Sequence, residues 1–259
     1  MIRMFRAGLA AALVLLAAPA SAQEVSRLDH ILQSGTLRVG TTGDYKPFTY
    51  RDPATGALSG FDIDQAEALG RALGVKVEFV QTAWPTLTKD FDTDRFDIAM
   101  GGVSVTLDRS KKGYFSTPYL RDGKTPITRC ENVSRFQTVQ DIDKPGVKAI
   151  VNPGGTNERF ARGNLNAAEI VVFPENTRIF EEIVAGKADL MTTDSSETRF
   201  QQKQHPGVLC AVHPDKPFDF AEKAYWIQRD MPFKQFVDQW LHLSQETGAT
   251  KALLAKWLD

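Results

Sequence analysis

Apolar residues in the first part of the chain follow two different periods. Residues 36–40 and 75–80 alternate between apolar and polar positions, which predicts strands. Residues 61–73 place apolar side chains along one helical face, and Gly74 is suited to end that helix. Residues 96–100 form an apolar run typical of a buried strand. Strand, helix and strand at this spacing predict parallel βαβ units.

The second half of the chain repeats this alternation. Strands and helices are predicted over 147–151, 158–164, 169–173, 177–185 and 188–192, and amphipathic helices over 232–243 and 249–258. The pattern therefore predicts two α/β lobes. Ligands of open α/β sheets bind beyond the carboxyl ends of strands. The loops at 41–48, 101–109, 152–157 and 192–197 follow predicted strands in this way, so we expect them to surround a ligand site.

The N-terminal segment has the composition of an export signal. Arg3 and Arg6 precede an apolar stretch, and Ala20-Ser21-Ala22 supplies small residues for cleavage. We expect residues 1–22 to be a cleaved signal peptide and the product to be periplasmic. A membrane anchor is the alternative, but no basic stop-transfer flank follows. We expect no membrane association of the mature form.

Composition narrows the classes of function. Lys and Arg number 31 against 32 Asp and Glu, which argues against a nucleic-acid partner. Four His and two Cys cannot form a cysteine-rich zinc module, and we predict no metal site. In an oxidising compartment, Cys130 and Cys210 favour one disulfide over two buried thiols.

Several short segments resemble the periplasmic amino-acid-binding proteins of solute-binding family 3. They are Leu37-Arg38-Val39-Gly40, Pro47-Phe48, Gly60-Phe61-Asp62-Ile63-Asp64, Phe96-Asp97-Ile98, Ser104-x-Thr106-x-x-Arg109 and Phe115-Ser116-x-Pro118-Tyr119. The resemblance implies a type II periplasmic-binding-protein fold: two Rossmann-like lobes, a central cleft and crossovers near 120–123 and 212–219. Lobe one is then expected at 23–120 plus 216–259, and lobe two at 121–215.

Four longer segments, at 42–48, 119–128, 150–157 and 217–225, resemble a narrower group, the periplasmic cyclohexadienyl dehydratases. That resemblance implies conversion of prephenate to phenylpyruvate and of arogenate to phenylalanine, with loss of water and CO2. No cofactor is expected, because formation of the aromatic ring supplies the driving force. The alternative function is a receptor that delivers a polar amino acid to a membrane transporter, since one fold serves both.

Two features are candidates for binding a substrate carboxylate. Arg109 follows a strand-end loop with Ser104 and Thr106, and a guanidinium fork with two hydroxyls suits a carboxylate. A surface ion pair with Asp108 is the alternative. The loop containing Gly155 and Thr156 precedes a helix whose free N–H groups attract anions. A plain capping turn is compatible with the same sequence.

Three aromatic residues fall in loops expected beside the cleft. Tyr45, Phe48 and Trp84 could form walls for a six-membered ring. We expect Phe48 to belong to the core instead. The family resemblance implies that Trp84 forms a wall of the cleft.

The candidates for catalysis are polar residues in the matched segments. The resemblance implies that Glu197 is the general acid, assisted by Lys124 and Asn152, and that Asp44 and Asp194 contact the substrate. In amino-acid receptors a residue at the place of Asp194 pairs with the ligand's amine. A departing hydroxyl must be protonated, and desolvation keeps a carboxyl protonated near neutral pH. The alternative for Glu197 is a solvated carboxylate on a helix.

Overall fold

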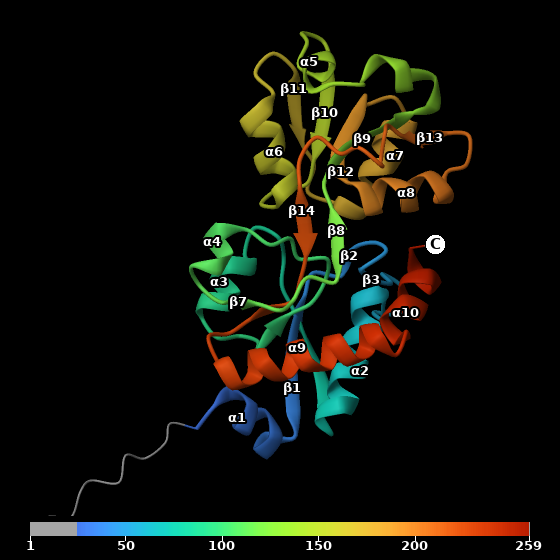
Figure 1. Cartoon of the computed structure of the whole chain (residues 1–259). Helices are drawn as coiled ribbons and strands as arrows, with labels where there is room; N and C mark the ends of the chain where they lie inside the picture. The colour runs from blue at the N-terminus through green and yellow to red at the C-terminus, as the bar shows by residue number, and fades with distance from the viewer. Residues whose placement is uncertain (1–24, 259) are drawn as a thin grey trace, which may run out of the picture.

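The computed structural model describes residues 25–258, so the predicted signal peptide lies outside the described residues. Two α/β lobes lie one above the other (Figure 1), and we define each by its sheet. Lobe one contains the sheet β5-β1-β6-β15-β7. Its strands are β1 (Thr36–Thr41), β5 (Lys76–Gln81), β6 (Ile98–Ala99), β7 (Tyr114–Phe115) and β15 (Trp226–Ile227). The parallel pairing of β1 with β5 and β6 confirms the predicted βαβ unit.

Helices cover the sheet of lobe one. They are α1 (Arg27–Ser34), α2 (Phe61–Leu73), α3 (Leu87–Asp92), α4 (Leu107–Ser110), α9 (Met231–Glu246) and α10 (Ala249–Trp257). Helix α2 buries Phe61, Ala66 and Leu69 in the main core, beside Phe48. It ends where Gly74 adopts a left-handed conformation with φ +71°. A small sheet of β2 (Asp44–Tyr45), β3 (Thr49–Arg51) and β4 (Leu58–Ser59) follows β1.

Lobe two contains the sheet β11-β10-β12-β9-β13. Its strands are β9 (Lys124–Arg129), β10 (Lys148–Val151), β11 (Glu169–Val172), β12 (Leu190–Asp194) and β13 (Leu209–Ala211). Its helices are η1 (Cys130–Arg135), α5 (Val139–Ile142), α6 (Thr156–Asn164), η2 (Asn176–Arg178), α7 (Ile179–Val184) and α8 (Ser195–Gln204). The predicted disulfide is confirmed: Cys130 and Cys210 are bonded, with 4.8 Å between their Cα atoms.

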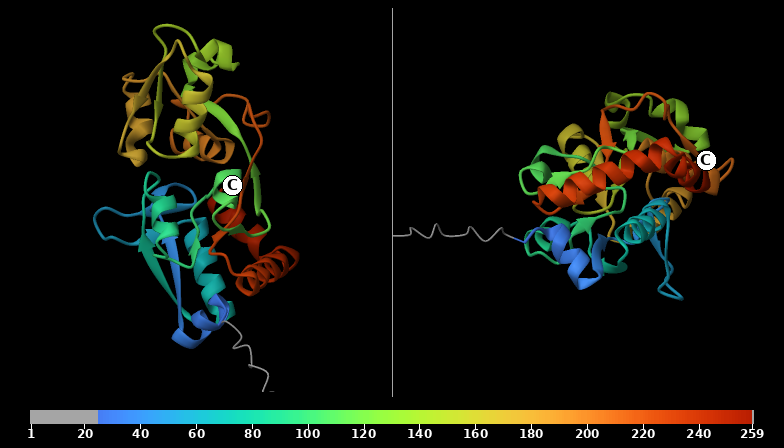
Figure 2. Two further views of the ribbon diagram at one scale, coloured as in Figure 1. Left: turned by 90° about the vertical axis from the view of Figure 1, so that its left-hand side faces the viewer. Right: turned by 60° about the horizontal axis from the view of Figure 1, so that its bottom comes forward.

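Two antiparallel strands, β8 (Leu120–Asp122) and β14 (Ala221–Lys223), connect the lobes. Figure 2 shows both connections on the same side of the molecule. Strand β14 lies beyond the crossover expected near 212–219. The reason is that lobe two still holds the preceding residues: Phe218 N donates to Lys124 O, and Asp219 accepts from Lys124 N. The residue boundaries expected for the lobes stay a prediction.

Within residues 25–258, no helix combines the length and the apolar character that crossing a bilayer requires.

Candidate active site

A small cavity of about 20 Å³ lies between the lobes. Its residues come from strand ends and helix starts of both lobes, as expected for such sheets. The lining residues are Tyr45, Trp84, Gly102, Ser104, Arg109, Asn152, Gly155, Thr156, Asn157, Asn176, Asp194 and Lys223. This volume accommodates about one water molecule. A ring-sized ligand therefore requires the cavity to widen.

Asp194 is the centre of a buried ionic cluster. Lys124 Nζ donates to its Oδ1 at 2.7 Å, and Lys223 Nζ to its Oδ2 at 2.5 Å. The Tyr45 hydroxyl also donates to Oδ2. Burial alone would raise the pKa of Asp194, but attraction by the two lysines holds this pKa well below its usual range. Asp194 is therefore ionised, and both of its oxygens are occupied.

Lys124 also binds the start of α6. Its Nζ donates to Thr156 Oγ1 at 2.9 Å and to Asn157 Oδ1 at 2.5 Å. Asn157 Nδ2 in turn donates to Asn152 Oδ1 at 3.2 Å. Lys124 is thus saturated by Asp194 and α6, and Asn152 is positioned through Asn157.

Glu197 lies in the first turn of α8 and is 2 % exposed, so it is buried and not solvated. Thr193 Oγ1 donates to its Oε2 at 2.5 Å. Burial raises the pKa of Glu197 to about 8, and the negative charge of Asp194 adds to this effect. The carboxyl is therefore mostly protonated at neutral pH. Its side chain does not line the present cavity.

Arg109 is 5 % exposed and lines the cavity. Its Nη1 donates to Ser104 O at 2.9 Å. Within the part of the chain that the structure describes, no carboxylate lies at ion-pair distance from it. Asp108 pairs with Lys111 at 3.0 Å instead, so the alternative of an Arg109–Asp108 pair is wrong. Burial lowers the pKa of Arg109 to about 10, which leaves it charged.

Other predicted residues take supporting positions. Thr106 caps α4 by accepting from Arg109 N at 3.3 Å, and it does not line the cavity. Trp84 lines the cavity, and its Nε1 donates to Asp44 Oδ1 at 3.0 Å. Asp44 itself does not line the cavity. Phe48 is fully buried in the core, as expected.

The structure adds residues that the sequence analysis did not select. Lys223, Asn157, Asn176 and Gly102 all line the cavity. Lys223 falls in the matched segment 217–225. A lysine close to Ala221, Ala224 and Tyr225 could have been selected from the sequence as a candidate site residue. Asn176 Nδ2 donates to Asp44 O at 3.0 Å across the cleft.

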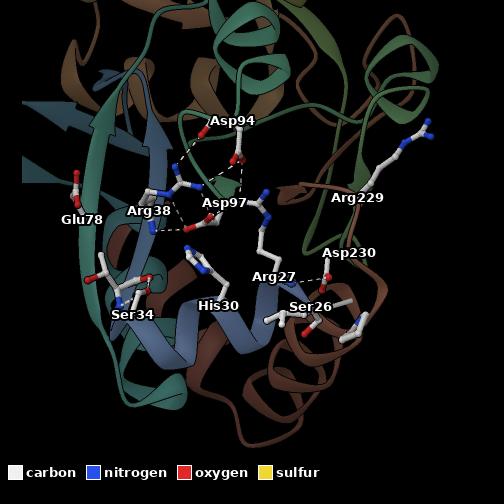
Figure 3. A pocket seen from close by; sticks show the side chains of 13 residues that line it. Ser26, Arg27, His30, Ser34, Arg38, Glu78, Asp94, Asp97, Arg229 and Asp230 are labelled. Carbon is white, nitrogen blue, oxygen red and sulfur yellow. Dashed lines mark hydrogen bonds and ion pairs between the residues drawn. The ribbon is translucent and has the colours of Figure 1, made fainter. Parts of the chain in front are cut away.

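A larger hollow of about 870 Å³ lies at the opposite end of lobe one (Figure 3). Arg27 and Arg38 point toward Asp97 there, at 2.7 and 2.6 Å. Asp94 lies within ion-pair distance of the same two arginines, at 2.9 and 3.5 Å, so two carboxylates balance Arg27 and Arg38. Among residues 25–258, no cluster of three or more His, Cys, Asp or Glu side chains is arranged to hold a metal ion.

Comparison with known proteins points to one family. A cyclohexadienyl dehydratase of Pseudomonas aeruginosa is 57 % identical over 96 % of this chain and 92 % of its own length. The crystal structure of AncCDT-1, an ancestral amino acid-binding protein described as a precursor of cyclohexadienyl dehydratase, has a TM-score of 0.83. It is 38 % identical over 90 % of this chain and 100 % of its own.

The crystal structure of a point variant of AncCDT-3, an ancestral cyclohexadienyl dehydratase, is 52 % identical, with a TM-score of 0.57. That match covers 91 % of this chain and 97 % of the other. The profile of the family described as "Bacterial extracellular solute-binding proteins, family 3" matches residues 37–259. The chain therefore belongs to the bacterial extracellular solute-binding proteins of family 3.

Proposed function

We propose that this chain is a cyclohexadienyl dehydratase, which converts prephenate to phenylpyruvate and arogenate to phenylalanine. The relative with 57 % identity carries that name, and so does an ancestral protein with 52 % identity. The observation that carries the proposal is the protonated carboxyl of Glu197, buried beside the ionic cluster of the cleft. A receptor that only binds amino acids has no need of a buried proton donor.

The reaction breaks two bonds and makes an aromatic ring. The ring carboxylate leaves as CO2, and the electrons of its C–C bond enter the ring. The C–O bond on the opposite side breaks, and the departing oxygen takes a proton to become water. Hydroxide is a poor leaving group, so a positioned acid lowers the barrier, typically by a factor of about 10² to 10⁴ in rate. Each turnover consumes one proton.

Glu197 is the proton donor in this proposal. Its carboxyl accepts from Thr193 Oγ1, and within residues 25–258 neither Lys124 nor Lys223 donates to it. Lys124 is held by Asp194, Thr156 and Asn157, so its charge is largely compensated there. A close ion pair with Lys124 would lower the pKa of Glu197 and favour loss of its proton. The arrangement therefore supports a general acid whose carboxyl stays protonated at neutral pH.

The remaining residues of the site bind and orient the substrate. Arg109 is a buried guanidinium without a carboxylate partner among residues 25–258, and a substrate carboxylate would neutralise it. Gly155 and Thr156 present the N-terminus of α6, which favours a negative group. Trp84 and Tyr45 provide aromatic walls for the ring. Asn152 lines the cavity and orients the ring hydroxyl toward Glu197, and Lys124 positions Asn152 through Asn157.

The family is extracellular, which supports export of this chain. With the predicted signal peptide, we place the reaction in the periplasm.

A direct assay tests the function. The mature protein is incubated with prephenate at neutral pH, and phenylpyruvate is followed by its enolate absorbance against a protein-free control. We expect rapid turnover. Absence of turnover, together with a thermal shift on adding an amino acid, would instead indicate the transport receptor.

The variant Glu197→Gln tests the acid. It keeps the size of the side chain and removes the proton, so turnover should fall at least ~100-fold while phenylpyruvate still binds. Glu246→Gln, at an exposed position of α9, is the matched control and should leave turnover unchanged. Turnover of Glu197→Gln within a few-fold of wild type would show that another group is the acid.

A further inference from the structure

Lys223 is the most deeply buried lysine of the cleft. It is 0 % exposed, yet it is one of the residues that line the cavity. It lies on β14, one of the two strands that connect the lobes. A buried ammonium group is costly unless its charge is compensated. The contacts of Lys223 therefore indicate which negative groups compensate its charge.

The carboxylate that Lys223 contacts is already shared. Asp194 accepts from Lys223 at 2.5 Å and from Lys124 at 2.7 Å, so two positive charges meet one negative charge. The nearby Asp122 accepts from Ser195 and Ser196 and bonds to neither lysine, although its charge also acts on Lys124. The two ammonium groups thus share one directly bonded carboxylate.

Lys223 and Arg109 meet at one residue. Lys223 Nζ donates to Ser104 Oγ at 3.0 Å, and Arg109 Nη1 donates to Ser104 O at 2.9 Å. Both cations line the same cavity. Within residues 25–258 Arg109 has no carboxylate at ion-pair distance, so a second positive charge beside Ser104 is unbalanced. Lys223 Nζ also contacts the Tyr45 hydroxyl at 3.3 Å. Two cations that flank one residue of the cavity lining favour an anion with two acceptor oxygens.

We propose that Lys223 is a substrate-binding residue that forms, with Arg109, a two-cation subsite for the carboxylate of the substrate's side chain. This inference rests on the proposed function, because it assigns Lys223 to the substrate of that reaction. The ring carboxylate must leave as CO2, and a cation bound to it would oppose its loss. The pair at Ser104 therefore binds the carboxylate that is retained.

The test compares steady-state kinetics of the mature wild type, Lys223→Met and Lys223→Arg with prephenate. Lys223→Met should raise KM at least tenfold and leave kcat within a few-fold, because ground-state and transition-state binding are lost together. Lys223→Arg keeps the charge and should recover most of the KM. Lys256→Met removes an ion-paired lysine from the surface of α10 and should leave both constants unchanged.

A purely structural role would give a different result. In that case Lys223→Met would lower the melting temperature with KM within twofold of wild type, which would overturn the inference. If Lys223→Met fails to fold, Lys223→Gln keeps a hydrogen-bond donor toward Ser104 and carries the same expectation.

Binding of phenylpyruvate by calorimetry separates this inference from the proposed function. If the wild type turned over no prephenate, the proposed function would be wrong, but the subsite would still require phenylpyruvate to bind at least tenfold more weakly to Lys223→Met. Equal affinity, or no binding to wild type, would reject the subsite.

Discussion

At the scale of the residue, Glu197 determines how activity depends on pH. Burial raises its pKa to about 8, and only the protonated form donates to the leaving hydroxyl. The fraction of active enzyme therefore falls as pH rises through about 8. We expect kcat for prephenate to be level from about pH 6 to 7 and to fall about tenfold per pH unit well above 8.

Rates measured from about pH 6 to 10, with spontaneous reaction subtracted, check this expectation. Asp194 is held ionised over this range by its lysines, and burial raises the pKa of Tyr45 well above its usual value. Asp62 also titrates within the range, because burial raises its pKa to about 7, so the fall assigned to Glu197 is the one above pH 8. A kcat that increased through pH 8 would mean that Glu197 acts as a base.

At the scale of the element, helix α8 depends on a residue of the connecting strand β8. Asp122 is 4 % exposed and accepts from Ser195 Oγ at 2.7 Å, Ser196 N at 3.2 Å and Ser196 Oγ at 2.5 Å. These bonds cap α8 at its first turn, which carries Glu197. Asp194, at the N-cap position itself, makes no capping bond because its oxygens bind the lysines.

We predict that Asp122→Ala lowers stability by about 1–2 kcal/mol, the usual cost of losing a cap, and also lowers kcat because Glu197 shifts. Asp141→Ala removes a residue of the capping box of α5, at a half-buried position, and is the control. Thermal unfolding and prephenate kinetics on both variants separate the effects. Equal kcat in the two variants would mean that Asp122 only stabilises the fold.

The elements also show what could be predicted from sequence. Periodicity predicted β1, α2 and β5, because apolar residues recur at strand spacing in β1 and β5 and at helix spacing in α2. It did not predict β9, because Lys124 and Thr125 are buried together and no alternation remains. The same limit applies to the site. Arg109 follows a recognisable strand-end loop, whereas two of the bonds that hold Lys223 in the cleft, to Tyr45 and Ser104, join it to residues more than 100 positions away.

At the scale of the whole molecule, the small cavity and the contacts across the cleft mean that the lobes must move apart before substrate can bind. About 20 Å³ cannot hold a substituted six-membered ring. The lobes are held together by Tyr45 and Lys223 bonding to Asp194, and by Asn176 bonding to Asp44 O at 3.0 Å. Substrate reaches Glu197 only when these contacts open, and β8 and β14 are the strands about which the lobes can turn.

This geometry predicts a change of shape that small-angle X-ray scattering measures. Without ligand, the protein should have a larger radius of gyration than the closed structure, because opening exposes charged groups to water. Saturating phenylpyruvate should reduce the radius toward the closed value, since its carboxylate neutralises Arg109 and restores contacts between the lobes. Asn176→Ala lacks one cross-lobe bond and should need more ligand for the same compaction. If the radius of the unliganded protein already equals that of the closed structure and ligand leaves it unchanged, substrate must enter by side-chain movement alone, and the connecting strands do not act as a hinge.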